Sequence, residues 1–382
     1  MFVVRLKDPS SEHLETLEAE AAPHAEIVRT VRLADDTFVL FRSEEAPDRW
    51  RDRLSSLPAV DSVHSVDTPY VLSSRVIRDQ RTRLDIGKDV VIGSEEFVVM
   101  AGPCTVETET QVATIAHSVR ASGARVLRGG AFKPRTSPFS FQGRGLEGLD
   151  ILSHAGRKAG LLQVSEAMCE EEVGDVASAV DILQVGMRNG LNYSLLEAIG
   201  RHPDQPAVLL KRGIGSTIDE FLAAADYILA GGNPNVILCL RGTVDFSKHS
   251  RSSLNVADIP ALRRLTHLPI VVDPSHAAGH RDLVPAMSAA ALVAGADGLL
   301  IEVHHEPDMA WVDGPQSLTL EGFSHLMNRL RALAPAIGRW VAPGVVSETD
   351  SLHPMEELDL ERPTRDRNLD TAALQGHEEL QA

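Results

Sequence analysis

The chain has 382 residues, 43% of them hydrophobic, which is enough for two domains or for one large barrel with additions. Its formal net charge of −17 argues against a nucleic-acid groove, because neutralising phosphates takes clustered lysine and arginine. Three scattered cysteines are too few for a disulfide framework, and no apolar run reaches the roughly 18 residues of a membrane span, so we expect a soluble, cytoplasmic protein that does not bind membranes.

Residues 1–70 are predicted to form a small ferredoxin-like α+β domain. Strands and helices are expected in the order βαββαβ, from the alternation of apolar residues and from the helix-capping serines. The expected strands are Phe2–Leu6, Glu26–Leu33, Thr37–Arg42 and about Val60–Val66, and the expected helices run from Ser10 or Ser11 to about Ala21 and over about Pro47–Ser56. Composition alone leaves open whether this domain regulates the protein or only serves packing and oligomerisation.

Residues 71–95 are predicted to hold a linker and a hairpin strand. Pro69–Ile86 is polar and rich in arginine, and Asp89–Ile92 is expected to pair with the next strand and to close the floor of a barrel. At the other end, Pro343 and Gly344 interrupt the last helix. Residues 341–382 are acidic and poor in large apolar side chains, which predicts a disordered tail.

Residues 96–340 contain eight apolar segments of strand length, and amphipathic helical segments separate them. This alternation predicts an α/β fold, a (β/α)8 TIM barrel, in which inward side chains pack the core and the chemistry lies at the C-terminal ends of the strands. The residues that follow the apolar segments are Cys104, Arg128, Glu166, Arg188, Lys211 with Arg212, Arg241, Asp273 with His276, and Glu302.

Four of the residues expected at this rim are metal-ligand types. Cys104, His276, Glu302 and Asp313, the last in the loop after the final strand, would offer one sulfur, one nitrogen and two oxygen donors. Such a mixed set suits a divalent transition ion better than magnesium, which prefers oxygen alone. The alternative stays open, because a buried cysteine is often only a small apolar side chain and His276 could be a hydrogen-bonded neighbour.

A set of basic residues is expected at the same rim. Guanidinium groups hold phosphate and carboxylate in forked geometry, and lysine acts as a mobile charge or an acid. Because these residues follow apolar strands rather than lie on helix exteriors, they favour an anion site for small phosphorylated substrates over a solvated surface. His304 keeps the alternation of the last strand and is expected to border this site. The basic residues are Arg128, Lys133, Arg135, Arg188, Lys211 and Arg241.

Several segments together resemble the 3-deoxy-D-arabino-heptulosonate 7-phosphate (DAHP) synthases, and specifically the subgroup related to 3-deoxy-D-manno-octulosonate 8-phosphate synthases. The resemblance covers about Asp89–Gly338 and implies a metal-dependent condensation of phosphoenolpyruvate with erythrose 4-phosphate and water, the first step of the shikimate pathway. The segments are AGPCTVE, LRGGAFKPRTSPFSFQG, VGMRN, VLLKRG, DPSHAAGHRD, and IEVHHEPD with DGPQSL.

The resemblance implies roles for individual residues. Cys104, His276, Glu302 and Asp313 match the family's ligands for manganese, iron, cobalt or zinc. Asp273 matches a residue near the aldehyde end of erythrose 4-phosphate. Of the matching positions, Lys133 is expected to act as an acid and Glu166 to position water. The residues implied around phosphoenolpyruvate are Arg128, Lys133, Glu166, Arg188, Lys211 and Arg241, and those implied around the erythrose 4-phosphate phosphate are Arg135 and Thr136.

Two other functions stay open from the sequence. One is octulosonate 8-phosphate synthesis, which KPRTS disfavours because those synthases carry an Asn-Arg-Ser type loop. The other is a non-catalytic regulatory homologue that binds a metabolite. The resemblance further implies a homotetramer or homodimer, with tyrosine or phenylalanine bound at the N-terminal domain between subunits. The chain departs from the family pattern at Met187, Leu240 and His280, of which Met187 could crowd the phosphoenolpyruvate pocket.

Overall fold

The computed structural model describes residues 1–345 except for residues 8–9, 23–24, 44–46, 136 and 247–248. The predicted disordered tail therefore lies almost wholly outside the described residues, and so does Thr136. Among the described residues, no helix is both long enough and apolar enough to cross a membrane.

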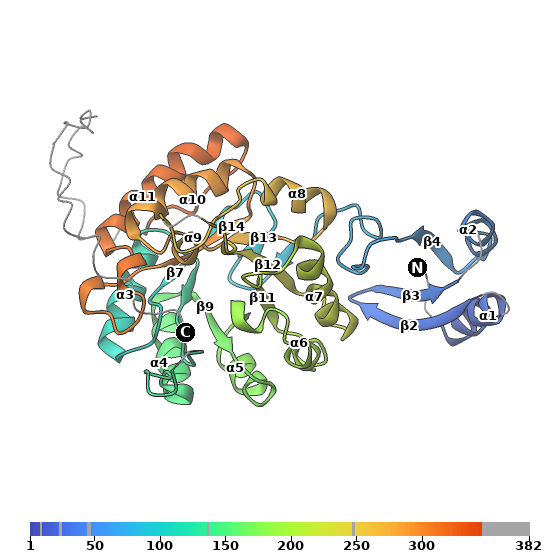
Figure 1. Ribbon diagram of the computed structural model, residues 1–382, viewed down its shortest axis with the longest axis horizontal. Coiled ribbons are helices and arrows are strands. Elements are labelled where there is room, and N and C mark those ends of the chain that lie inside the picture. The colour runs from blue at the N-terminus through green and yellow to red at the C-terminus, as the bar shows by residue number, and fades with distance from the viewer. Residues whose placement is uncertain (8–9, 23–24, 44–46, 136, 247–248, 346–382) are drawn as a thin grey trace. The chain divides into compact units, whose positions relative to one another are not determined.

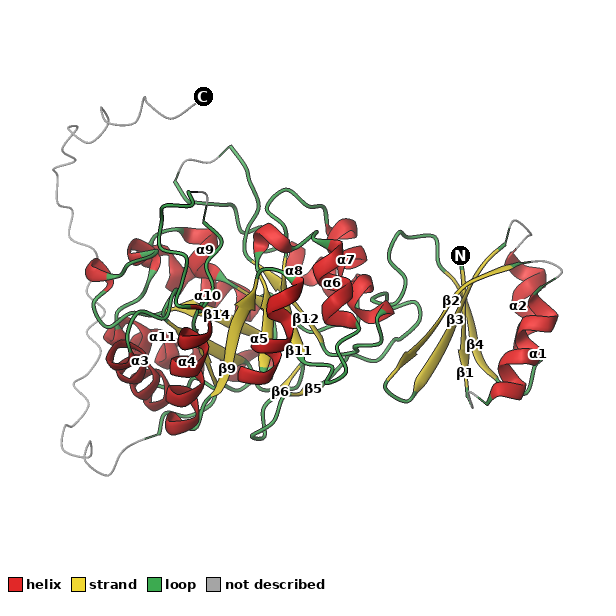
Figure 2. Cartoon of the chain, turned by 90° about the horizontal axis from the view of Figure 1, so that it is seen from below, coloured by secondary structure: helices red, strands yellow, loops and turns green. Residues whose placement is uncertain are grey.

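The N-terminal residues form the predicted ferredoxin-like sheet. Strands pair antiparallel in the order β2-β3-β1-β4, and α1 and α2 lie on the same side of this sheet (Figure 2). Phe2, Val4 and Leu6 alternate onto that side and pack with residues of both helices. Ser10 caps α1 by accepting a hydrogen bond from the His13 amide. The elements are β1 Phe2–Leu6, α1 Ser11–Ala21, β2 Glu26–Leu33, β3 Asp36–Arg42, α2 Pro47–Ser55 and β4 Val60–Ser65.

A closed parallel barrel follows, as the sequence predicts. Its eight strands pair in the ring β7-β8-β9-β10-β11-β12-β13-β14, and helices surround them (Figure 1). The strands are β7 Val98–Gly102, β8 Val126–Arg128, β9 Leu162–Ala167, β10 Ile182–Val185, β11 Ala207–Lys211, β12 Val236–Leu240, β13 Ile270–Val272 and β14 Gly298–Glu302. The α-helices are α3 Glu109–Ala121, α4 Gly145–Ala159, α5 Val173–Ala179, α6 Tyr193–Gly200, α7 Ile218–Ala230, α8 Asp258–Leu265, α9 Pro274–Ala278, α10 Val284–Val293 and α11 Leu320–Leu333.

Alternation along each strand separates two apolar layers. Val98 and Met100 on β7 pack into the barrel interior, whereas Val99 and Ala101 pack against the helices. Both faces of the sheet are therefore buried, which explains why the strands are continuous apolar runs. The interior packing leaves room for polar chemistry only where the strands end.

Residues 91–92 form a hairpin strand, but the strand predicted to pair with it is wrong. β6 (Val91–Ile92) pairs antiparallel with the preceding segment, β5 (Leu84–Asp85), and not with the strand that follows. Two physical reasons account for this. Gly87, Lys88 and Asp89 all adopt positive φ angles and reverse the chain just before β6. In addition, β8 and β14 occupy both edges of β7, so the closed barrel offers no free edge.

The hairpin and the linker are packed against the barrel. Leu84 and Ile92 belong to the same apolar cluster as the barrel interior, as expected for a barrel floor. The Asp226 carboxylate on α7 accepts hydrogen bonds from three successive linker amides, those of residues 71–73. His267 holds the linker at two further points, because Nδ1 lies 2.7 Å from the Thr82 hydroxyl and Nε2 lies 2.9 Å from the Leu72 carbonyl oxygen.

The His267 contacts predict a pH-dependent stability. Burial lowers the pKa of His267 from about 6.5 to about 4, so the folded chain keeps this ring neutral while the unfolded chain protonates it below pH 6.5. Its contribution is complete above pH 6.5 and is lost as the pH falls toward 4, by up to about 3 kcal/mol. In urea unfolding, His267→Gln should destabilise the protein clearly at pH 7.5 and much less at pH 5. An equal loss at both pH values would contradict this explanation.

Candidate active site

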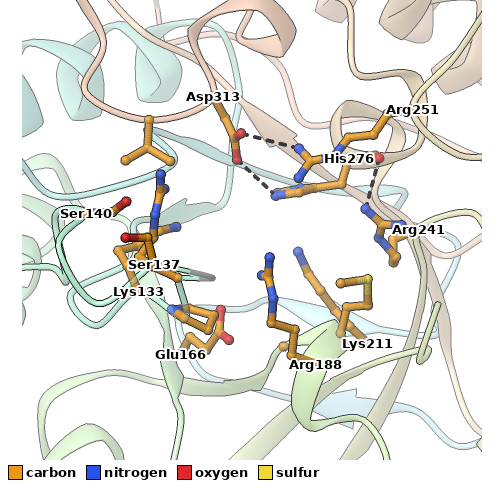
Figure 3. Close-up of a pocket in the computed structure, with 15 residues that line it drawn as sticks. Lys133, Ser137, Ser140, Glu166, Arg188, Lys211, Arg241, Arg251, His276 and Asp313 are labelled. Atoms are coloured by element: carbon orange, nitrogen blue, oxygen red, sulfur yellow. Dashed lines mark hydrogen bonds and ion pairs between the residues drawn. The ribbon is translucent and has the colours of Figure 1, made fainter. Parts of the chain in front are cut away.

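The C-terminal ends of the barrel strands surround a cavity of about 300 Å³. Its wall carries six lysine and arginine residues from four strand-to-helix connections, and Figure 3 shows Arg188 and Lys211 extending into it on the side opposite Asp313. Glu166, His276 and Asp313 also line this cavity. An acidic protein thus concentrates positive charge at one mouth, as the sequence predicts. The six residues are Lys133, Arg135, Arg188, Lys211, Arg241 and Arg251, of which Arg251 is not predicted from the sequence.

Four side chains at one edge of the cavity form a cluster that could hold a metal ion. One donor atom each of Cys104, His276, Glu302 and Asp313 lies within 4.8 Å of the others. Asp313 Oδ2 lies 3.4 Å from Cys104 Sγ and 3.8 Å from His276 Nε2, which is itself 3.5 Å from Glu302 Oε1. A sulfur, an imidazole nitrogen and two carboxylates fit a divalent transition ion.

Electrostatic interactions keep the Glu302 carboxylate of this cluster ionised, and burial keeps the Cys104 thiol protonated. Burial alone would raise the pKa of Glu302, but His276 and Arg128 lower it to about 2. Burial and the neighbouring Glu302 charge raise the pKa of the Cys104 thiol to about 12. A bound cation would lower the pKa of this thiol and favour the thiolate, because metal-bound cysteine is deprotonated.

Asp273 orients two residues of the site without lining the cavity. It is fully buried after β13 and caps the N-terminus of α9. Pro274 is the first residue of that helix, a position where proline is favoured because the backbone N–H has no partner within the helix. Its carboxylate accepts a hydrogen bond from the His276 amide at 3.0 Å, lies 2.8 Å from His276 Nδ1 and accepts a bond from Lys211 Nζ at 2.6 Å. The Nδ1 contact leaves His276 Nε2 directed at the metal-ligand cluster.

Two arginines at strand ends contact carboxylates instead of the cavity. Arg128 on β8 is buried and donates to Glu302 Oε1 at 2.6 Å, so it contacts the metal-ligand cluster and is not among the residues that line the cavity. Arg212 follows Lys211 and points the other way, where it donates to Asp258 at 2.7 Å and to the Ser216 carbonyl. The alternation of β11 explains why only Lys211 of this pair faces the cavity.

Gln184 and Gly186, which belong to no recognisable sequence motif, position Glu166 at the cavity wall. Its Oε2 accepts a hydrogen bond from Gln184 Nε2 at 2.9 Å, whereas its Oε1 is buried without a partner among the described residues. The backbone of Gly186 makes room for this carboxylate, since a Cβ there would lie 1.9 Å from Oε1. Glu166 therefore lines the cavity and has one carboxylate oxygen without a partner among the described residues.

The remaining sequence predictions fall at different places. His304 is buried, with Nε2 3.5 Å from Glu107 Oε2, and does not line the cavity. Met187 lies in the cavity wall. Leu240 packs with the helix-facing layer, and His280 is an exposed residue beside Asp282. Sequence reasoning missed Gln184, Arg251 and Gln316, because single polar residues in loops and strands carry no spacing signal.

Comparison with known proteins identifies the family of this chain. Residues 76–335 match the DAHP synthetase I family. The chain belongs to this family. The phospho-2-dehydro-3-deoxyheptonate aldolase of Thermotoga maritima is 47% identical over 287 residues, which cover 75% of this chain and 84% of the relative. The 2-dehydro-3-deoxyphosphooctonate aldolase of Geobacter sulfurreducens is 31% identical over 276 residues, which cover 65% of this chain and 97% of that protein.

Solved structures place the DAHP synthetase I fold over most of the chain. The crystal structure of the Thermotoga maritima phospho-2-dehydro-3-deoxyheptonate aldolase (DAHP synthase) covers 89% of this chain and 99% of its own, with 41% identity and a TM-score of 0.71. A truncated form of the Thermotoga enzyme covers 72% of this chain with a TM-score of 0.67. The higher identity to the heptonate enzyme agrees with KPRTS and does not favour the octulosonate alternative.

Proposed function

We propose that this chain is a metal-dependent DAHP synthase, which condenses phosphoenolpyruvate, erythrose 4-phosphate and water to DAHP and phosphate. One observation carries the proposal: a four-donor metal-ligand cluster borders a cavity whose wall carries six lysine and arginine residues. Both substrates are anions, and a site that binds them together must neutralise more than one phosphate. A purely binding homologue would have no need for metal donors and a reactive lysine in one cavity.

The metal would be held by Cys104, His276, Glu302 and Asp313. When bound, a divalent ion such as manganese, iron, cobalt or zinc supplies a Lewis acid that polarises the aldehyde oxygen. Asp273 supports this site by fixing the His276 ring through Nδ1, 2.8 Å away.

The basic residues organise the two substrates. In this proposal Arg188, Lys211 and Arg241 hold phosphoenolpyruvate, and Arg128 supports the same end of the site through Glu302. Arg135 holds the phosphate of erythrose 4-phosphate together with Thr136, which lies outside the described residues. Opposed cationic side chains offset the repulsion between two anionic substrates and bring the reacting carbons together.

Lys133 and Glu166 transfer protons in the proposed reaction. C3 of phosphoenolpyruvate attacks the aldehyde carbon, and Lys133 gives a proton to the alkoxide that forms. Water adds at C2 and loses a proton to Glu166, whose Oε1 lacks another partner among the described residues. The tetrahedral intermediate then releases phosphate with C–O cleavage. Asp273 contacts both Lys211 Nζ and His276 Nδ1, and it thereby holds these two side chains in fixed positions near the aldehyde.

Chelation tests the metal part of this proposal. Protein treated with a chelator should release no phosphate from phosphoenolpyruvate and erythrose 4-phosphate, and manganese, iron, cobalt or zinc should restore turnover at one ion per chain. Magnesium serves as the control, because it disfavours a thiolate ligand. Full activity after exhaustive chelation, with no metal left by elemental analysis, would contradict the proposal.

The N-terminal domain is proposed to bind tyrosine or phenylalanine between subunits of a homotetramer or homodimer in the cytoplasm. Support comes from the ferredoxin-like sheet and from β2, an edge strand with several exposed residues that could meet a second copy. Millimolar tyrosine or phenylalanine should lower the rate of phosphate release, whereas leucine, the control, should not. An unchanged rate across that range for both aromatic amino acids would remove this part of the proposal.

A further inference from the structure

The two carboxylates of the metal-ligand cluster each have one oxygen that faces away from it. Glu302 Oε1 and Asp313 Oδ2 are the oxygens near His276 Nε2. The other oxygen of Glu302, Oε2, accepts a hydrogen bond from Gln316 Nε2 at 2.6 Å. The other oxygen of Asp313, Oδ1, lies 3.3 Å from Arg251 Nη1 (Figure 3). Both outward oxygens are therefore occupied by protein donors.

These two donors are bonded to each other. Arg251 Nη1 donates to Gln316 Oε1 at 2.9 Å, so a continuous chain of contacts runs from Glu302 through Gln316 and Arg251 to Asp313. The amide orientation of Gln316 is fixed by chemistry, because a carboxylate can only accept and a guanidinium can only donate. Gln316 has one arrangement that satisfies both neighbours.

The backbone places the two residues from different parts of the barrel rim. Gln316 ends the short 3-10 turn Gly314–Gln316, which begins directly after Asp313, a residue in the left-handed region with φ 56°. Arg251 lies in the connection between β12 and α8, and its amide donates to the Ala278 carbonyl at 3.1 Å. The contact chain thus joins the loop that carries Asp313 to the loop after β12.

We propose that Arg251 and Gln316 form a clamp that holds Glu302 and Asp313 with one oxygen each toward the bound metal ion. The clamp, defined by these two residues, rests on the proposed metal site and deepens it. Both are positioning residues, because they act on the ion only through its carboxylate ligands. With their outward oxygens engaged, the two carboxylates are kept from chelating the ion with both oxygens, which limits the number of protein donors around it.

The two halves of the clamp should differ in strength. Gln316 and Glu302 are 2% and 1% exposed, so removing the amide leaves a buried carboxylate oxygen without its donor. The Arg251 side chain is 43% exposed and that of Asp313 is 26% exposed, so solvent screens this pair. Loss of Gln316 should weaken metal binding by about 10-fold to 100-fold, and loss of Arg251 by only a few-fold. Because the two act in series, the double variant should bind little worse than the Gln316 variant.

Metal binding tests the clamp without using activity. The variants are Gln316→Met, which keeps side-chain length and fills the same space, Arg251→Ala at the exposed end, and the double variant. Cobalt affinity is measured in competition with a chelating dye, and the absorption spectrum of the cobalt-loaded protein reports the coordination number. Arg281→Ala is the matched control, because Arg281 holds the same loop through Asp308 and the Gly314 carbonyl but contacts neither outward oxygen.

The expected result is weaker cobalt binding in Gln316→Met, with weaker visible bands as a carboxylate becomes bidentate, and wild-type binding in Arg281→Ala. Wild-type affinity and spectrum in both Gln316→Met and Arg251→Ala would overturn the clamp alone. Equal weakening in Arg281→Ala would overturn it too, since general loop order would then explain the loss. If Gln316→Met does not fold, Arg251→Ala decides by the same readout. Wild-type protein that binds no cobalt would overturn the metal site and the clamp together.

Discussion

A Lys133→Met variant is expected to keep its metal ion and to lose about a thousandfold in kcat, the scale of general acid catalysis. Lys133 is buried, and its Nζ lies 3.1 Å from both the Sγ and the carbonyl oxygen of Cys104. Burial alone would lower the pKa of Lys133, but Cys104, Glu166 and Glu302 raise it above its ordinary value. The side chain is therefore a protonated amine beside the metal-ligand cluster, placed to protonate an alkoxide formed there.

The matching control is Lys88→Met at the opposite end of the barrel. Lys88 Nζ donates to the Leu161 carbonyl oxygen at 2.7 Å, so this variant also removes an ammonium group bonded to a backbone oxygen. It should turn over at close to the wild-type rate. Steady-state phosphate release, with metal content measured on the same samples, separates the two variants. A Lys133→Met protein that holds its metal and turns over at the wild-type rate would exclude Lys133 as the acid.

Replacing Cys104 by alanine should remove both metal binding and turnover. Cys104 supplies the only sulfur of the cluster, and neighbours that merely orient ligands already change metal affinity by 10-fold to 100-fold. Loss of a donor itself should weaken cobalt or zinc binding by more than about 100-fold. The thiolate-to-cobalt charge-transfer band should disappear with it, because that band requires a sulfur ligand.

The chain provides a control for this variant in Cys239. Both thiols are buried, and burial raises the pKa of each to about 12, but Cys239 packs inside the barrel with Leu209 and Val271. Cys239→Ala should therefore lose some stability through a small cavity and keep its metal, its charge-transfer band and its activity. An unchanged band in Cys104→Ala, or loss of the band in Cys239→Ala, would place the sulfur ligand elsewhere.

The barrel could be predicted from the sequence because its signal is repeated. Eight buried strands alternate with amphipathic helices, and each strand needs both faces covered, so the apolar runs are long enough to recognise. The hairpin partner could not be predicted in this way. Strands β5 and β6 have two residues each, and their pairing depends on three successive positive φ angles and on the absence of a free edge on β7.

The site was predictable at the level of strand ends, but its contacts were not. Lys211 and Arg128 both follow apolar strands, yet Lys211 lines the cavity whereas Arg128 contacts Glu302 instead. What decides between these outcomes is which partner lies within hydrogen-bonding distance across the barrel, 174 residues away for Arg128. Gln316 shows the same limit, because a neutral side chain becomes significant only when two charged partners converge on it.

The most direct test of the proposed function is phosphate release from phosphoenolpyruvate with each of two aldose phosphates. Metal-loaded protein should release phosphate with erythrose 4-phosphate, and kcat/KM with arabinose 5-phosphate should be at least about 100-fold lower, because the longer sugar displaces either its phosphate or its aldehyde from its binding partner. Product analysis should find the seven-carbon DAHP. Preference for arabinose 5-phosphate, or no turnover with either sugar by the metal-loaded protein, would contradict the proposal.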